Sequence, residues 1–288
     1  MRTALALLEL ARPAQWIKNG FVLLPLFFAH ALLDGDALRG ALLATAAFCL
    51  AASAVYAFND ARDAERDRLH PDKRMRPVAR GAVGAKPAYC LSAALALLSL
   101  LIAAAVRIEV AAVIALYLGI QLAYSLGLKR IAYLDVVIVA SGFALRIIAG
   151  GLSADVPLTP WILAMGFLLA LMLALGKRHG DLVHVEDVRA RAASGYDLAT
   201  IERLLAGLSG AVIAAYVLYT FSPEVIARHG HHALFYSTPW VLLGVLRYLF
   251  LVFRRGAGGD PSRLAVRDPV LLLATVGWLA TLGGILYL

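Results

Sequence analysis

Residues 40–58 read GALLATAAFCLAASAVYAF, and residues 59–67, which follow directly, read NDARDAERD. The first stretch has the apolar character of a membrane span, which needs about 20 residues. On a helix that turns about 100° per residue, Asn59, Asp60, Asp63 and Asp67 fall within one quadrant. The sequence therefore predicts a membrane helix whose end carries four oxygen-bearing side chains on one face.

Acidic side chains grouped in this way repel one another unless a cation holds them together. Magnesium suits such hard oxygen ligands and is usually bound by a few carboxylates together with the phosphates of a substrate. The cluster thus predicts a metal-assisted diphosphate site at the membrane surface, where the membrane helix ends. The expected metal ligands are Asn59, Asp60, Asp63 and Asp67. The alternative is a solvated helix end balanced by Arg62, Arg66 and Arg68.

The composition excludes a soluble domain, because 61% of the 288 residues are hydrophobic, only 16% are charged and the mean hydropathy is +0.79. The expected fold is all-α, a polytopic membrane protein with one membrane domain that covers residues 1–288. Nine candidate spans are separated by charged or Pro/Gly-containing stretches. They are 18–35, 39–59, 87–106, 109–127, 133–151, 160–176, 204–221, 236–253 and 269–287.

The distribution of basic residues predicts the orientation. With the N-terminus in the cytoplasm, all but five of the 27 Lys and Arg residues fall on the cytoplasmic side, as positive loops should. The exceptions are Arg39, Arg107 and Arg228 outside and Arg146 and Arg247 within spans. The net charge of +8 is therefore mainly a topological signal, although basic loops also attract anionic lipids and phosphorylated substrates. Since the cations are divided among short loops, we expect no nucleic acid partner.

Three cytoplasmic segments carry further polar side chains. In the loop that follows the acid cluster, Lys73, Arg74 and Arg76 are suited to phosphate groups, or else they only enforce the topology. In the next segment Tyr124, Ser125 and Lys129 could bind a phosphate, although Tyr and Lys are also ordinary membrane-interface anchors.

The third segment and the fifth span add acids and cations. Lys177, Arg178 and Asp181 follow the sixth span. Within the fifth span, Asp135 and Arg146 share one stripe, with Arg146 near the bilayer centre, where a charge is costly and faces a partner or a water-filled cavity. We therefore expect Arg146 to line an internal cavity, the alternative being a structural ion pair.

The spacing Asn59-Asp60-x-x-Asp63-x-x-x-Asp67 at the cytoplasmic end of the second span resembles the first aspartate-rich motif of the UbiA intramembrane prenyltransferase superfamily. The resemblance covers essentially the whole chain and implies nine transmembrane helices around a lateral cavity. Four further stretches are similar to the decaprenyl-phosphate phosphoribosyltransferase branch of this superfamily. They are Arg12-Pro13-x-Gln15-Trp16-x-Lys18-Asn19, Tyr124-Ser125-x-x-Leu128-Lys129, Arg146-x-x-Ala149-Gly150-Gly151 and Gly176-Lys177-Arg178.

The resemblance implies a magnesium-dependent enzyme of the cytoplasmic membrane that transfers 5-phosphoribose from phosphoribosyl pyrophosphate to a polyprenyl phosphate. Its catalytic residues would be Asp60, Asp63, Asp67, Lys177 and Arg178. Its substrate-binding residues would be Gln15, Lys18, Asn19, Lys73, Arg74, Arg76, Tyr124, Ser125, Lys129, Asp135, Arg146 and Asp181. Asp181 departs from the pattern, because this branch has Glu there. Assembly as a homo-oligomer is compatible with the sequence.

Two other classes of protein remain as alternatives. An aromatic prenyltransferase of the same superfamily would use a polyprenyl diphosphate donor, but it usually carries a second aspartate-rich motif where this chain has the basic Lys177-Arg178 pair. A secondary transporter would also bury charge, but it would not need an acid cluster confined to one membrane face.

Overall fold

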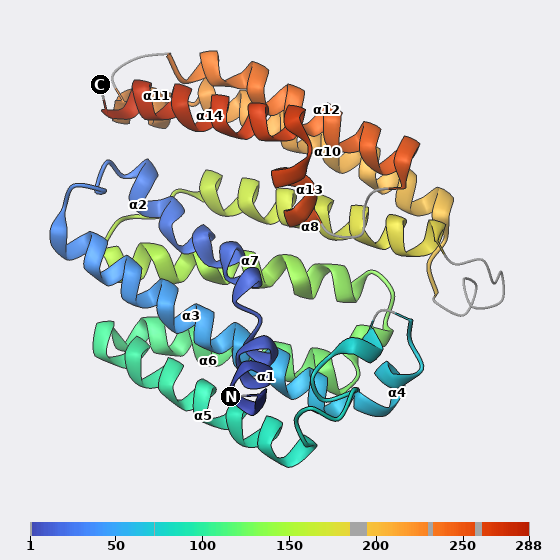
Figure 1. Cartoon of the computed structure of the whole chain (residues 1–288). Helices are drawn as coiled ribbons and strands as arrows, with labels where there is room; N and C mark the ends of the chain where they lie inside the picture. Colours follow the sequence, from blue (N-terminus) through green and yellow to red (C-terminus); the bar gives the residue numbers. More distant parts are fainter. Residues whose placement is uncertain (1, 72, 185–194, 230–232, 257–260, 288) are drawn as a thin grey trace. The chain divides into compact units, whose positions relative to one another are not determined.

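The computed structural model describes residues 2–71, 73–184, 195–229, 233–256 and 261–287. Its elements are helical throughout these residues, which confirms the all-α prediction (Figure 1). The chain divides into two compact units, each with its own hydrophobic core. Unit 1 comprises residues 1–128 and 145–158, and unit 2 comprises residues 129–144 and 159–288.

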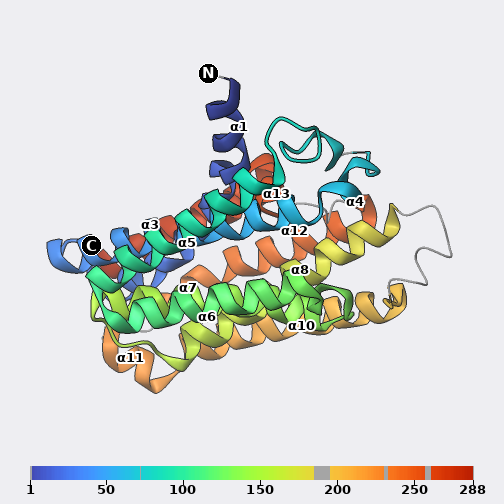
Figure 2. The same ribbon diagram turned by 90° about the horizontal axis from the view of Figure 1, so that it is seen from below.

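Unit 1 begins with α1 (Arg2–Ala11), the 3₁₀ helix η1 (Pro13–Leu23) and α2 (Leu24–Phe28). The long helices α3 (Gly35–Arg62), α5 (Ala85–Val106) and α6 (Ile108–Leu126) pack side by side (Figures 1 and 2). Between α3 and α5 lie two short elements, α4 (Ala64–Arg68) and η2 (Lys73–Met75). The second half of α7 (Leu134–Ala154) also belongs to this unit.

Unit 2 contains the first half of α7, most of the short helix η3 (Leu128–Arg130), and the long helices α8 (Pro160–Val183), α10 (Leu198–Thr220), α12 (Thr238–Arg255) and α14 (Pro269–Tyr287). Helix α10 packs against both α8 and α12, and α12 packs against α14. The shorter elements are α11 (Pro223–His229), η4 (Ala233–Ser237) and α13 (Pro261–Arg267).

Within the described residues, eight helices are long and apolar enough to span a membrane, so this is a multi-pass membrane protein. They correspond to eight of the nine expected spans. The remaining one, 18–35, is instead the end of η1 followed by the five-residue helix α2. Gly20 and Pro25 lie inside this stretch, and both residue types disfavour a continuous α-helix.

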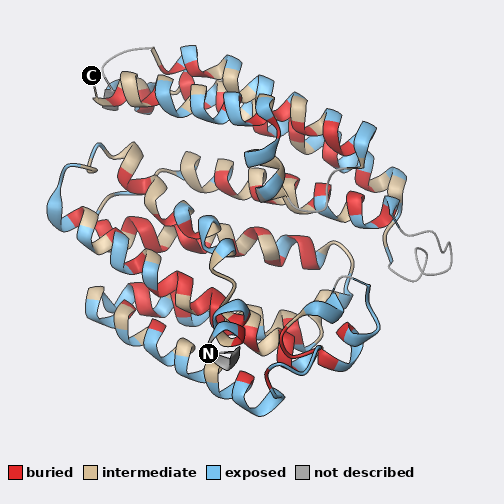
Figure 3. Cartoon of the chain, viewed as in Figure 1, coloured by how far each residue is buried: buried red, intermediate tan, exposed pale blue. Residues whose placement is uncertain are grey.

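The sequence of α3 explains its length and its burial. Asp34 caps its N-terminus, because the carboxylate accepts hydrogen bonds from the backbone N–H groups of Asp36 and Ala37. Small residues, mostly alanine, follow, and most are buried against neighbouring helices, whereas α5 exposes much of its surface (Figure 3). With 28 residues the helix is about 42 Å long, which exceeds the hydrocarbon core of about 30 Å. The helix is therefore long enough to cross the core with its polar C-terminal end outside it.

Close approach of backbones in unit 1 depends on glycine. A Cβ atom at Gly150 would collide with the carbonyl of Val22 and with the ring of Pro25, so the second half of α7 contacts η1 and α2 only because this side chain is absent.

We expect Gly150→Ala to lower the free energy of unfolding by about 1–3 kcal/mol, since the helices must separate to make room for the methyl group. Gly119→Ala in α6 is the matched control, because a Cβ there would lie within 4 Å of nothing beyond its chain neighbours and the backbone of its own helix. Thermal unfolding of both variants in detergent measures the effect. Equal unfolding temperatures of the two variants would show that α7 does not approach Val22 and Pro25 closely at Gly150.

Candidate active site

A series of polar contacts joins the N-terminal segment to one face of α3. The three side chains of α3 that take part are four and seven residues apart, so they project from the same side of the helix. Ser53 also donates a hydrogen bond to the carbonyl of Ala11, at 2.7 Å. The pairs are Asn19 Nδ2 with Cys49 Sγ at 3.1 Å, Trp16 Nε1 with Ser53 Oγ at 3.0 Å, and Arg12 Nη2 with Asp60 Oδ1 at 2.5 Å.

Asp60 and Asp67 of the acid cluster are both buried, and two arginines neutralise them. Arg76 bridges the two acids, with Nη1 at 2.6 Å from Asp67 Oδ2 and 3.4 Å from Asp60 Oδ1. Arg12 supplies the second charge to Asp60, and its guanidinium lies 4.9 Å from the centre of the Tyr56 ring. A buried carboxylate needs such partners because an unpaired charge is costly away from water.

For Asp60 and Asp67 the structure differs from the alternative of a solvated helix end balanced by Arg62, Arg66 and Arg68, because both acids are buried and pair with other arginines. In the described part of the chain, none of these three pairs with Asp60 or Asp67. Arg62 donates to the carbonyl of Leu126 at 3.3 Å, and Arg68 donates to that of Ala79 at 3.1 Å.

The helix that carries the acids is interrupted at Asp63, between the end of α3 and the start of α4. Backbone hydrogen bonds still run from Asp63 N to Asn59 O at 2.9 Å and from Asp67 N to Asp63 O at 2.8 Å. The chain therefore keeps a nearly helical path from Asn59 to Asp67, as the spacing of the acids requires.

Two oxygen atoms of this cluster fit a metal ion. Asn59 Oδ1 and Asp60 Oδ2 are buried, and neither has a hydrogen-bond partner in the structure. Buried acceptors normally find a donor, so their lone pairs are suited to a cation. Among the described residues no three His, Cys, Asp or Glu side chains form a ready-made metal cluster. The two unpartnered oxygens suit magnesium, which proteins usually hold with a few side-chain oxygens together with water and substrate oxygens.

Arg146 is buried in the core of unit 1 between the aromatic rings of Phe48 and Tyr117. Its guanidinium carbon lies 5.2 Å from the first ring centre and 5.0 Å from the second, distances at which cation–π attraction operates. Nε donates to Asn19 Oδ1 at 2.8 Å, and Nη2 donates to the Tyr117 hydroxyl at 3.3 Å. Through Asn19, Arg146 is thus linked to η1 and to Cys49 of α3.

The other predicted residues of unit 1 are more dispersed. Gln15 and Lys18 are half-buried on η1, and Lys73 and Arg74 are exposed on η2. At the end of α6 Tyr124 is half-buried, and the buried Ser125 donates its hydroxyl hydrogen to Gln121 O at 2.7 Å.

In unit 2, the buried Asp135 forms an ion pair with the half-buried Arg178. Arg178 Nε and Nη2 lie 2.7 Å and 2.5 Å from Asp135 Oδ2, and Nη1 lies 3.3 Å from Asp181 Oδ2. Asp135 is only 1% exposed, whereas Asp181 is exposed. Helix α8 continues past the expected span end at 176, so the neighbouring Lys177 is also helical and exposed, while Lys129 is half-buried on η3.

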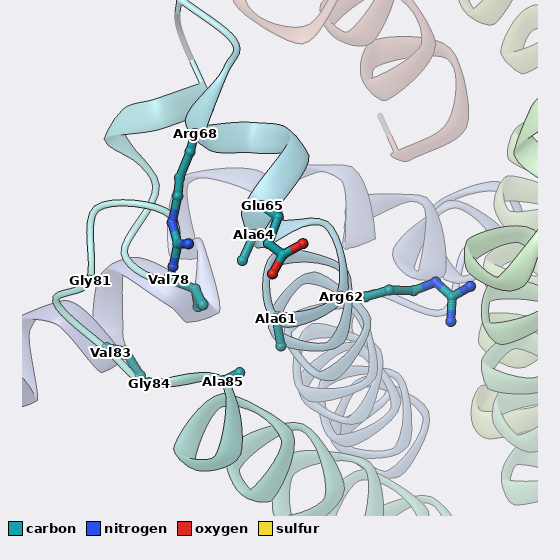
Figure 4. Close-up of a pocket in the computed structure, with 10 residues that line it drawn as sticks. All are labelled: Ala61, Arg62, Ala64, Glu65, Arg68, Val78, Gly81, Val83, Gly84 and Ala85. Carbon is teal, nitrogen blue, oxygen red and sulfur yellow. The ribbon is translucent and has the colours of Figure 1, made fainter.

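A cavity of about 330 Å³ is lined by residues from the end of α3, from α4 and from the loop that follows (Figure 4). The helical side of its wall includes Ala61, Ala64, Glu65 and Arg68, and the loop side consists of Val78, Gly81, Val83, Gly84 and Ala85. None of the predicted site residues lines this cavity, so it is separate from the acid cluster.

Comparison with known proteins identifies the family. Residues 22–267 match the model of the UbiA prenyltransferase family. The chain belongs to this family. It is therefore an enzyme, a transferase of the UbiA superfamily, and the resemblance predicted from the aspartate motif is confirmed.

Several curated relatives of this UbiA protein are named decaprenyl-phosphate phosphoribosyltransferase. The relative from Mycolicibacterium smegmatis is 37% identical, with 98% of this chain and 92% of the relative covered. The relative from Mycobacterium tuberculosis is 36% identical over 94% and 91%, and that from Corynebacterium glutamicum is 32% identical over 94% and 84%.

Solved structures show the same fold. A UbiA homolog from Archaeoglobus fulgidus bound to GPP and Mg²⁺ has a TM-score of 0.73 and 19% identity, with 98% of this chain and 100% of that chain covered. A structure of digeranylgeranylglyceryl phosphate synthase has a TM-score of 0.68 and 16% identity, with 100% of both chains covered. At these identities the likeness establishes the fold alone.

Three residues that had no predicted role contact predicted site residues in the structure. Arg12 pairs with Asp60, Tyr117 contacts Arg146, and the hydroxyl of Tyr196 donates to Asp135 Oδ1. The stripe of Cys49, Ser53, Tyr56 and Asp60 on α3 was visible as a helical spacing and could have indicated a polar partner. No comparable signal points to Tyr196.

Arg76→Gln should lower the free energy of unfolding by about 2 kcal/mol, because Asp67 loses its ion-pair partner and repels the neighbouring Asp60. Arg74→Gln is the matched control, since Arg74 is exposed two residues earlier. Thermal unfolding of the purified variants in magnesium-free buffer checks the difference, and equal unfolding temperatures would contradict the bridging role.

Proposed function

We propose that this UbiA-family protein transfers 5-phosphoribose from phosphoribosyl pyrophosphate to a polyprenyl phosphate, releasing pyrophosphate, and acts as one membrane domain of the cytoplasmic membrane. The observation that carries the proposal is the ion pair between Arg178 and the buried Asp135. It anchors a cation where an aromatic prenyltransferase usually has a second group of acids. The relatives named decaprenyl-phosphate phosphoribosyltransferase support the same choice.

The charges match substrates that both carry phosphate. A polyprenyl phosphate and phosphoribosyl pyrophosphate each need cations, and the candidates are Lys18, Lys73, Arg74, Arg76, Lys129, Lys177 and Arg178. The basic loops lie on the cytoplasmic side in the topology that we propose, so the soluble donor approaches from the cytoplasm. The lipid acceptor, by contrast, is dissolved in the membrane and reaches the site from within it.

The acid cluster is the candidate magnesium site, with Asn59, Asp60, Asp63 and Asp67 as ligands. When bound, magnesium supplies positive charge that stabilises the departing pyrophosphate. Arg12 and Arg76 already contact Asp60 and could remain beside it to bind donor phosphates. This arrangement places both signs of charge next to one another, which a metal–diphosphate complex requires.

The reaction needs no general base. An oxygen of the lipid phosphate, already anionic, forms a bond to the anomeric carbon of the ribose. The bond between that carbon and the pyrophosphate oxygen breaks, and pyrophosphate leaves with the electron pair. The protein therefore has to position two anions and neutralise the leaving group, which is the work that fixed cations do.

Purified protein supplied with labelled phosphoribosyl pyrophosphate and polyprenyl phosphate should release pyrophosphate and form a labelled lipid, and both should require magnesium. Chromatography of the lipid product and a pyrophosphate assay give the measurement. Omission of the polyprenyl phosphate is the control. Transfer of a prenyl group to an aromatic acid from a polyprenyl diphosphate, with no phosphoribosyl transfer, would overturn the proposal.

Asp63→Asn should reduce turnover at least about 100-fold while the protein stays folded, because one metal-binding charge is lost. Glu65→Gln is the matched control: it removes a carboxylate from the same segment, but this one faces the cavity of Figure 4. Its turnover should stay within about threefold of the wild type. Full activity of Asp63→Asn would remove Asp63 from the site.

A further inference from the structure

Tyr196 lies just before α10 and contacts residues at the start of α7, all within unit 2. Its hydroxyl donates a short hydrogen bond to Asp135 Oδ1 and accepts one from the backbone N–H of Tyr133 at 3.0 Å. The two tyrosine rings also meet edge to face, with 4.8 Å between their centres. Tyr196 therefore contacts this turn through both its ring and its hydroxyl.

The backbone on both sides of the contact has left-handed conformations. Gly195 has φ +73°, and a Cβ atom there would lie 3.4 Å from Ala132 Cβ. Tyr133 has φ 65°, which is unfavourable for a residue with a side chain and costs about 1–2 kcal/mol. The hydrogen bond from Tyr133 N to Tyr196 and the ring contact stabilise this turn, which leads directly into Asp135.

The two oxygens of Asp135 accept hydrogen bonds from different partners. Oδ1 accepts from the Tyr196 hydroxyl and from the backbone N–H of Val136 at 2.8 Å, whereas Oδ2 accepts from Arg178. A carboxylate held at both oxygens cannot rotate, so the guanidinium that it binds has one orientation. The Nη1 edge of Arg178 is directed toward Asp181 and is part of a side chain that is 30% exposed.

Burial and the hydrogen bond to Asp135 raise the pKa of Tyr196 well above its ordinary value. The phenol therefore keeps its proton throughout the physiological pH range and remains a donor to Asp135. A phenolate would repel the carboxylate instead.

We propose that Tyr196 is a positioning residue, which acts through Asp135 to hold the Arg178 guanidinium in the orientation that binds a substrate phosphate. The proposal rests on the proposed function for the identity of the substrate, but the chain of contacts from Tyr196 to Arg178 does not depend on it. Tyr196 itself touches no reacting atom in this scheme.

A double-mutant cycle tests the proposal on the full-length protein. Tyr196→Phe removes one hydroxyl and keeps the ring, so we expect the KM for phosphoribosyl pyrophosphate to rise about tenfold, with kcat changed less than about threefold. Arg178→Gln should raise this KM further. If Tyr196 acts through Arg178, adding Tyr196→Phe to Arg178→Gln has little additional effect, less than about twofold.

Tyr236→Phe is the control, because it removes a hydroxyl from an exposed tyrosine of the same unit. Its KM should match that of the wild type. The proposal is overturned by an unchanged KM in Tyr196→Phe, or by effects of Tyr196→Phe and Arg178→Gln that simply multiply. Multiplication would mean that Tyr196 affects the KM independently of Arg178.

A binding measurement separates this proposal from the proposed function. The same four variants and the wild type are titrated with inorganic pyrophosphate, and the shift of the unfolding temperature gives the Kd. If the wild type transfers no phosphoribose but binds pyrophosphate, and Tyr196→Phe weakens that binding only when Arg178 is present, the proposed function fails and the positioning role stands. Absence of pyrophosphate binding in the wild type would overturn the positioning role as well.

Discussion

The structure of unit 1 depends on the buried ion pairs at the end of α3, where Arg12 and Arg76 neutralise Asp60 and Asp67. Buried carboxylates are costly without partners, so the loop that carries Arg76 and the segment that carries Arg12 must both return to this helix. Arg12 adopts a left-handed backbone conformation with φ 52° as it does so. The local cost, of order 1–2 kcal/mol, is offset by the contact with a buried charge.

The same constraint explains how the N-terminal segment follows α3. From Asp60 inward, Ser53 and Cys49 offer polar atoms on the same face, and Trp16 and Asn19 bond to them in turn. Asn19 then accepts a hydrogen bond from Arg146, whose guanidinium also lies over the rings of Phe48 and Tyr117. A continuous series of polar contacts thus connects the acid cluster at the helix end to Arg146 in the core of unit 1. Polar groups within an apolar bundle are satisfied best when they bond to one another.

Much of the fold could be predicted because it depends on local patterns. The long apolar runs gave eight helices able to span a membrane, and the spacing from Asn59 to Asp67 identified the acid cluster and the family. Residues 18–35 are also largely apolar, but Gly20 and Pro25 interrupt the helix there, an effect that a count of apolar residues does not register. The roles of Arg12 and Tyr196 were not predictable, since each contacts an acid that lies 48 or 61 residues away.

The sequence by itself determined the number and type of residues available: apolar helices, one acid-rich helix end, and cations gathered in the loops. These follow from composition and from the period of a helix, which relate residues only a few positions apart. Only the tertiary structure decided which cation meets which acid, with Arg76 rather than Arg62 bridging Asp60 and Asp67, and Arg178 held by Asp135 and Tyr196. The physical reason is that burial selects these pairs, and burial depends on how distant segments of the chain pack together.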